Sequence, residues 1–253
     1  MNPSPLVKLT RTRKLVIMSD IHVGAEEFEE AAFLEALRWV KDHEALVYFA
    51  GDLCDNAIAS GKDAGEKLMG QKWWPTEQAK WFIDRVKPLA KAGRVAGILR
   101  GNHDARTRRE SLFDICDLIA HSLEVRYDGH GVASRWLAGK ELYTLGIHHG
   151  STAAKNIWLE LKRMLDLYAH ADLVAAGHNH AFAAEPMPHI TVDAHGHERR
   201  GVRWMVRTGC FLGYAEYLRP LCLPPSATGC PIIGFGDSKH ELEVDVQTLR
   251  WNR

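Results

Sequence analysis

"KLVIMSDIHVG", residues 14–24, joins an apolar run to a polar turn that stops at a glycine. The apolar run predicts a strand, and Asp20 and His22 follow where the chain leaves it. In an extended chain, side chains two residues apart project from the same face, so this spacing predicts that a carboxylate and an imidazole converge on one point. A metal ion is one candidate for that point. The alternative is an aspartate that caps a turn beside a surface histidine.

The composition sets broad limits on size and partners. The 253 residues are enough for one large domain or two small ones, and we expect a single domain over 1–253. The 32 basic and 32 acidic side chains balance, so no global field draws the protein to nucleic acid or to a membrane. Any contact with a polyanion must therefore be local. The 14 histidines, many of them beside glycine or aspartate, point towards metal chemistry.

The cysteines and the hydropathy indicate the compartment. The five cysteines are odd in number and form no C-x-x-C pair, which favours a reduced, intracellular setting. Residues 1–20 contain no apolar stretch long enough for a signal peptide, and no later segment has the length of a membrane span. We therefore expect a soluble, cytoplasmic protein with no membrane partner.

The first half of the chain alternates strands with helices. An amphipathic pattern over 28–40 predicts a helix, 45–52 is a short apolar strand, a helix follows Pro75 over 76–93, and 94–102 is a further buried strand. This order implies right-handed crossovers and a parallel sheet whose functional loops gather at the carboxyl ends of the strands.

The second half repeats the pattern more loosely. We predict a strand over 140–150, a helix over 156–170, a strand over 171–180, a hairpin of 189–194 and 202–209 around the loop 195–201, and an edge strand over 241–251. The Pro- and Gly-rich stretch 219–231 must be irregular; a plain connection is favoured over a loop that covers the site. The predicted fold class is α/β, a layered αββα sandwich of two mixed β-sheets flanked by helices.

Polar side chains able to bind metals follow five of these strands. They are Asp20 with His22, Asp52, Asn102 with His103 and Asp104, His148 with His149, and His178 with His180. Solvation and turn capping do not explain five separate clusters, each placed where a buried strand runs into a glycine turn.

The order of these motifs resembles that of the calcineurin-like metallophosphoesterase superfamily. The motifs are D-x-H at 20–22, G-D-x-x-D at 51–55, G-N-H-D at 101–104, H-G at 149–150 and G-H-x-H at 177–180. They span 20–180, and the C-terminal hairpin and edge strands occupy 187–253. More loosely, the tail 207–236 is similar to the ends of metallophosphoesterases from phages and prophages.

The resemblance implies a pair of divalent ions. Asp20, His22, Asp52 and His180 would hold the first ion; Asp52 would bridge to the second, which Asn102, His149 and His178 would complete. His149 is chosen over His148 because it directly precedes Gly150, as the family motif requires. Carboxylate, imidazole and amide ligands suit manganese, which we favour, and also iron, zinc or nickel.

The resemblance also assigns the catalytic residues. His103 would lie near the scissile phosphate and protonate the leaving oxygen, and Asp104 would orient it. The segment "DNAIASG" after Asp52 lacks the arginine that the large protein Ser/Thr phosphatases carry, which argues against that class.

Three features favour nucleic acid, DNA or RNA, or nucleotides as substrate. Arg106 and Arg108, with Arg109, follow His103 and can meet backbone phosphates; Trp73 and Trp74 can stack on bases; Arg199 and Arg200 lie in the hairpin loop. Each has an ordinary alternative, since arginines after a turn are often a solvated helix start and a tryptophan pair can simply fill the core.

These observations predict a two-metal phosphodiesterase that acts on nucleic acid or nucleotides through a hydroxide bridging the ions. The alternatives are a phosphomonoesterase of small phosphorylated metabolites and a non-catalytic binding scaffold with the same fold. Scaffolds of that kind tend to lose ligands, whereas this chain keeps all seven and His103, so we favour catalysis.

Overall fold

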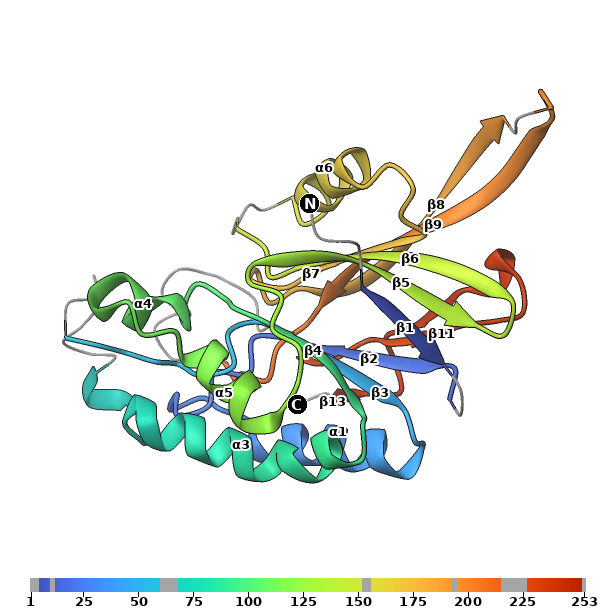
Figure 1. The fold of residues 1–253 in the computed structure, drawn as a ribbon. Coiled ribbons are helices and arrows are strands. Elements are labelled where there is room, and N and C mark those ends of the chain that lie inside the picture. The colour runs from blue at the N-terminus through green and yellow to red at the C-terminus, as the bar shows by residue number, and fades with distance from the viewer. Residues whose placement is uncertain are drawn as a thin grey trace.

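Two β-sheets lie face to face and helices cover their outer sides, which confirms the predicted layered αββα sandwich (Figure 1). The computed structural model describes residues 5–9, 12–59, 68–151, 156–192, 195–214 and 227–251. The helices are α1 (Glu30–Asp42), α3 (Pro75–Lys91), α4 (Ala105–Ser111), α5 (Ile115–Leu123), α6 (Leu159–Leu167) and the 3-10 helix η2 (Lys239–Glu241). The strands are β1 (Leu6–Leu9), β2 (Lys14–Met18), β3 (Leu46–Ala50), β4 (Val95–Leu99), β5 (Gly131–Ala138), β6 (Glu141–His148), β7 (Leu173–Ala176), β8 (Phe182–Val192), β9 (Glu198–Thr208), β10 (Thr228–Gly229), β11 (Ile232–Gly234), β12 (Glu243–Asp245) and β13 (Arg250–Trp251).

The first sheet has five strands in the order β12-β11-β2-β3-β4. Its β2, β3 and β4 are parallel, as predicted, and β11 runs antiparallel to β2. Side chains alternate across it: Val16 and Met18 pack in the cluster shared with α1, α3 and α5, whereas Leu15 and Ile17 pack in the cluster between the sheets. Because both faces are covered, this strand is apolar throughout.

The second sheet has six strands in the order β1-β5-β6-β7-β9-β8, with parallel and antiparallel pairs mixed. Helix α6 covers part of its outer face, where Leu161 and Met164 pack against Val174 and Met205. The carboxyl ends of β6 and β7 thereby face the same region as those of β2, β3 and β4 (Figure 1).

The structure differs from the predicted elements in several places. The hairpin is longer than predicted, because β8 begins at Phe182 and β9 takes in 198–201 of the predicted loop. The predicted edge strand over 241–251 is broken, because the Asp245 carboxylate accepts hydrogen bonds from the amides of Gln247 (2.7 Å) and Thr248 (3.0 Å) and turns the chain. The strands β1 and β5 and the helices α4 and α5 were not predicted.

Two remaining expectations concern membranes and cysteines. Among the helices that the structure describes, none has both the length and the apolarity needed to span a bilayer. Cys54, Cys116, Cys210 and Cys230 are buried free thiols. Cys222 and most of the stretch predicted to be irregular, 219–226, lie outside the described residues.

Candidate metal centre

The loops that follow β2 and β3 run side by side at one end of the first sheet. The Asp20 amide donates to the Gly51 carbonyl (3.0 Å) and the His22 amide donates to the Asp52 carbonyl (3.0 Å). These hydrogen bonds continue the parallel pairing beyond the strands and set the D-x-H and G-D-x-x-D motifs against each other.

The ligand-bearing residues have an unusual backbone. Asp20 and His22 both have φ of 51°, Asp52 has 50°, His178 has 69° and His180 has 56°. Each such left-handed residue costs about 1–3 kcal/mol unless its surroundings enforce it, and such strain clusters at functional sites. The expectation that Asp20 and His22 converge because the chain is extended is therefore wrong. They converge because two left-handed residues turn the chain there.

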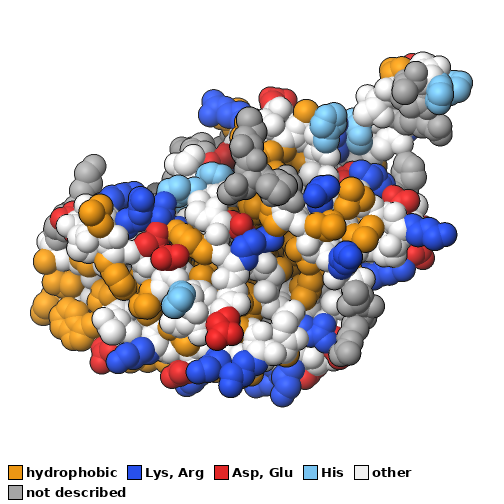
Figure 2. All heavy atoms as spheres, viewed as in Figure 1, with side chains coloured by type: hydrophobic (Ala, Val, Ile, Leu, Met, Phe, Trp, Pro, Cys, Tyr) orange, Lys and Arg blue, Asp and Glu red, His pale blue; other side chains and the backbone are white. Residues whose placement is uncertain are grey.

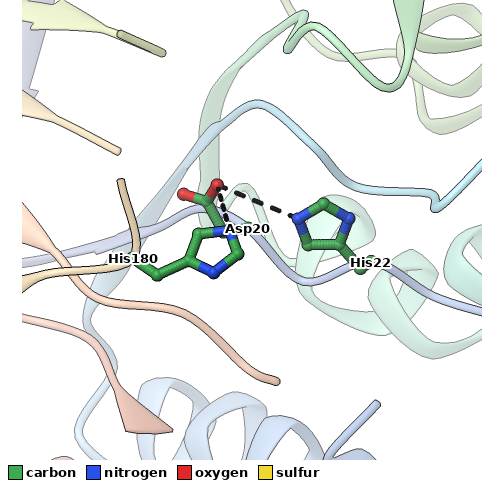
Figure 3. Close-up of side chains that lie close together, drawn as sticks. All are labelled: Asp20, His22 and His180. Carbon is green, nitrogen blue, oxygen red and sulfur yellow. Dashed lines mark ion pairs between the residues drawn. The ribbon is translucent and has the colours of Figure 1, made fainter. Parts of the chain in front are cut away.

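Asp20, His22 and His180 form the first cluster. The Asp20 Oδ1 atom lies 3.4 Å from His180 Nε2 and 3.9 Å from His22 Nε2 (Figure 3). Three ligand atoms, one from each residue, lie within 4.8 Å of one another. Asp20 Oδ1 and His22 Nε2 are both buried and have no hydrogen-bond partner in the described structure. Buried polar atoms without a hydrogen bond need another partner, and a cation bound between these two atoms would be such a partner.

Asp52, His149 and His178 form the second cluster, and Asn102 joins it. His149 Nε2 lies 3.3 Å from Asp52 Oδ2 and 3.0 Å from Asn102 Oδ1, and His178 Nδ1 lies 2.7 Å from the same amide oxygen. The Nδ1–H of His149 donates to the Ala50 carbonyl (2.9 Å). A carbonyl only accepts, so this contact leaves Nε2 of the neutral ring free to bind a cation.

The Asp52 carboxylate lies between the two clusters, and with His22 and His103 it forms a third group of ligand atoms within 4.8 Å of one another. His22 Nε2 lies 3.7 Å from Asp52 Oδ2, the same oxygen that faces His149. All seven residues predicted as ligands are thus gathered around two adjacent points. His148 lies outside both clusters, and its Nδ1 accepts from the Gly150 amide (2.9 Å).

Buried charge makes this region favourable for cations. Burial alone would raise the pKa of Asp20, but His180 lowers it to about 2. Burial also raises the pKa of Asp52, yet His149 and His103 hold it well below its usual range. In turn, burial lowers the pKa of His149 while Asp52 raises it more strongly, to about 10. The carboxylates therefore stay ionised and require positive charge, which protonated imidazoles or bound cations provide.

His103 stands at the edge of the two clusters. Its Nδ1–H donates to the Asp55 backbone carbonyl (3.1 Å) and faces the Asp55 carboxylate at 3.1 Å. The Arg106 guanidinium donates to its Nε2 (3.1 Å). The backbone amide of His103 donates to Asp52 Oδ1 (2.8 Å), so this imidazole is fixed beside the shared carboxylate.

Asp104 does not orient His103 as predicted; Asp55 takes that position. The buried carboxylate of Asp104 accepts the amides of Gly101 (2.9 Å), Leu53 (3.1 Å) and Cys54 (3.1 Å). Burial raises its pKa to about 6, and the Asp52 charge contributes to the rise. Asp104 thus ties the loop after β4 to the loop after β3.

A buried ion pair supports the loops of the second sheet. The Arg207 guanidinium donates to Glu160 (3.1 Å) and to the Gly177 carbonyl (3.1 Å), which directly precedes His178. Glu160 also accepts the Ser151 amide (2.7 Å), two residues after His149. The pair therefore holds both histidine-bearing loops of this sheet.

Two motif glycines are required by close approach. A Cβ atom on Gly101 would lie 2.0 Å from the Asp52 carboxylate, and one on Gly177 would lie 2.3 Å from Ser19 Oγ. No other residue would let these loops approach so closely.

The residues predicted to bind substrate are spread out. Arg106 lies in the site, whereas Arg108 is more exposed, with its Nε 3.7 Å from Asp114. Trp73 packs against the core and stacks on Trp81 at 5.8 Å, and Trp74 is 61% exposed at the start of α3. Arg200 lies far along β9 from the site.

Three residues that support the site were not singled out from the sequence. Asp55 stands within G-D-x-x-D, and this motif was the signal available for it. Glu160 and Arg207 carry no sequence signal, because their pairing arises only when α6 packs on β9.

Comparisons with known proteins bear on the family of the chain. Solved structures similar to the chain include a conserved uncharacterized protein of Streptococcus pneumoniae, described as a predicted phosphoesterase (13% identity, 94% of this chain and 90% of that chain, TM-score 0.43). Others are Vps29 of Entamoeba histolytica in complex with Zn (13%, 92% and 97%, 0.45) and a hypothetical protein of Pyrococcus horikoshii (11%, 92% and 86%, 0.48). None of the curated proteins compared with the chain matches it.

The family model for calcineurin-like phosphoesterases matches residues 13–182, more than half of the chain. The matched region begins in front of β2 and ends at the start of β8, so it contains all the loops that form the two clusters. With the motifs in order and their side chains gathered at one end of the two sheets, the chain belongs to the calcineurin-like phosphoesterase family.

Proposed function

We propose that this protein is a phosphodiesterase that uses two divalent ions to hydrolyse nucleic acid or nucleotides. The observation that carries the proposal is a pair of buried atoms without a hydrogen bond, Asp20 Oδ1 and His22 Nε2, which lie 3.9 Å apart beside a second cluster of ligands. Buried polar atoms without a hydrogen bond are costly unless a bound cation compensates them.

The donor atoms fit the proposed ions. Asp20, His22, Asp52 and His180 would hold the first ion, and Asn102, His149 and His178 would complete the second, with Asp52 shared. Oxygen and imidazole donors without a thiolate favour manganese, iron, zinc or nickel, and we propose manganese. When bound, such ions polarise a phosphoester and lower the pKa of water.

The chain's own residues would position the ester and move the proton. Asp55 holds the proton of His103 on Nδ1, so Nε2 is the nitrogen that can exchange a proton with a leaving oxygen. Arg106 now donates to that nitrogen. A phosphate oxygen would compete for the guanidinium as a stronger acceptor, which would free Nε2 for the leaving group.

Preference for a diester rests on the arginines beside this imidazole. Arg106 reaches His103, and Arg108 lies two residues further along α4 with its side chain 54% exposed. Arg106 can contact a phosphate at the site, and the exposed Arg108 can contact another phosphate of a polynucleotide.

The proposal is tested with purified protein and added manganese. Bis-p-nitrophenyl phosphate, p-nitrophenyl phosphate, cyclic nucleotides and single- and double-stranded DNA and RNA are the substrates. We expect diester cleavage that is lost in Asp52→Asn and His178→Ala and retained in His121→Ala, which removes an exposed histidine of α5. Faster monoester turnover would move the assignment to a phosphomonoesterase. Binding of both ions without hydrolysis of any ester would favour a scaffold.

The role of His103 is tested separately from ligation. His103→Ala should lower kcat by about 10²- to 10⁴-fold, the usual contribution of a positioned general acid, and leave the metal content unchanged. Metal analysis of the same preparations checks the second part. Loss of metal in this variant would show that His103 is a ligand instead.

A further inference from the structure

The hairpin of β8 and β9 extends beyond the strand next to it. Towards the tip of the hairpin, the pairing of β7 with β9 stops at Leu173 and Trp204. The pairing of β8 with β9 continues beyond this point, as far as Val192 and Glu198. We call 187–192 with 198–203 the arm; Figure 1 shows it projecting from the body. The edge of the sheet therefore has a step at the start of β7, beyond which the arm continues without β7.

A hollow of about 300 Å³ lies at this step. Three segments line it: the connection from α6 to β7, the base of the arm, and η2. The basic side chains among its lining residues are His170, His189, Arg200, Arg203 and Lys239. Figure 2 shows histidine and basic side chains gathered where the arm leaves the body.

The positive charge of the hollow is only partly neutralised. Among the described residues, Asp172 is the one acidic residue that lines it. Its carboxylate is already used, because it accepts from Lys239 Nζ (2.9 Å) and from the Thr144 amide (2.8 Å). The two arginines are left in excess, in a chain whose total charge is balanced.

His189 gives the hollow a fixed polar wall. Its ring lies against Gly201, where a Cβ atom would come within 2.7 Å of the ring. Its Nδ1 is buried and has no hydrogen-bond partner among the described residues. As a lining residue, the imidazole can hydrogen-bond a ligand oxygen that enters the hollow.

The hollow is separate from the metal centre. Thr208, at the far end of β9, contacts Ser19 beside Asp20 at 2.6 Å. Arg203 lies five residues earlier on the same strand, which corresponds to about 16 Å of extended chain. The hollow and the metal ligands thus occupy opposite ends of β7 and β9.

We propose that the hollow is a second ligand site, which binds a small phosphate-bearing molecule of about nucleotide size. Arginine forks recognise phosphate oxygens with paired hydrogen bonds, and the two arginines with His189 place donors on more than one side. The volume is at the lower end of the range for small-molecule pockets. The site does not depend on the function proposed for the metal centre.

Calorimetry on the full chain tests this site in buffer with EDTA, so that binding through metal ions is excluded. The probes are inorganic phosphate, adenosine 5′-monophosphate and a short oligothymidylate. The double variant Arg200→Gln/Arg203→Gln should weaken binding by about tenfold or more, because a charged hydrogen bond contributes at least that factor. His189→Phe keeps the ring on Gly201, removes both nitrogens and should weaken binding severalfold.

The matched control is Lys8→Gln/Arg250→Gln, which removes two exposed cations outside the hollow. Lys8 lies on β1, at the opposite edge of the six-stranded sheet. Binding of phosphate or the mononucleotide that falls in the arginine variant but not in the control supports a small free ligand. Binding of the oligonucleotide alone, with the same dependence, shows that the phosphate comes from a polymer and overturns the assignment to a small molecule. Equal effects in both double variants, or no binding of any probe at millimolar concentration, overturn the site itself.

Discussion

The two halves of the candidate metal centre are held by different means. In the half formed by the first sheet, the Asp104 carboxylate accepts amides from the loops after β3 and β4. In the half formed by the second sheet, the Arg207 and Glu160 ion pair holds the loops after β6 and β7. One half depends on backbone amides bonded to a single acid; the other depends on two opposite charges, both buried.

This difference predicts how each half fails. Loss of the Asp104 carboxylate leaves neutral amides without acceptors, whereas loss of Arg207 leaves an unpaired carboxylate in the interior. An uncompensated buried charge costs more than an unsatisfied amide. A single substitution should therefore lower the free energy of unfolding more in the second half than in the first. A second substitution that removes the remaining charge should restore part of that loss.

Arg207→Met should have the largest effect on stability. The side chain of Arg207 is fully buried, and its removal leaves the Glu160 carboxylate without a counter-charge, so we expect the free energy of unfolding to fall by about 3–5 kcal/mol. Urea denaturation measures this change. The double variant Glu160→Gln/Arg207→Met removes both charges and should recover part of the loss. If the double variant is as unstable as Arg207→Met, charge isolation is not the cause.

Asp104→Ala should have a smaller effect, about 2–4 kcal/mol. Each buried amide without an acceptor costs about 1–3 kcal/mol, and losses at neighbouring groups do not add fully. Asp104→Asn keeps one oxygen acceptor and should cost less. Urea denaturation of both variants gives the comparison. A greater loss for Asp104→Ala than for Arg207→Met would reverse the ranking of the two halves.

The sequence predicts well those parts of the fold whose signal is local. The central strands are apolar on both faces, so their runs stand out, and the ligands follow in motif order. Helix α5 has a local signal that the prediction does not use, since Asp114 caps it by accepting the Cys116 amide (3.2 Å). Strand β5 has none, because its buried face carries Ser134 and its other face carries Leu137, so the sequence does not alternate apolar with polar residues although the burial does.

Other parts of the site cannot be found in this way. A left-handed backbone is uncommon for any residue other than glycine, even for Asp and His, and at Asp20 and His22 it accompanies amide hydrogen bonds to carbonyls of the neighbouring loop. Likewise, sequence proximity favours Asp104 as the partner of His103, but the contact is made by Asp55, which is distant in the chain. Tertiary packing decides both features.

Glu124→Gly should have the smallest effect, and the opposite sign. Glu124 ends α5 with φ of 55°, close to the values at Asp20 and His22, but it is exposed and lies outside the metal clusters. Glycine adopts this backbone without strain, so we expect the free energy of unfolding to rise by about 0.5–1 kcal/mol with unchanged activity. Thermal and urea unfolding measure the gain.

The outcome at Glu124 also bears on the metal centre. In both halves of the site, ligands occupy the same left-handed region, at Asp20 and His22 in one and at His178 and His180 in the other. A higher free energy of unfolding in Glu124→Gly would show that a left-handed backbone at a residue other than glycine destabilises this fold. The site would then keep the strain because only these side chains can bind the ions. No gain would mean that the conformation carries little cost in this protein, and the strained backbone would no longer support a functional role for the ligands.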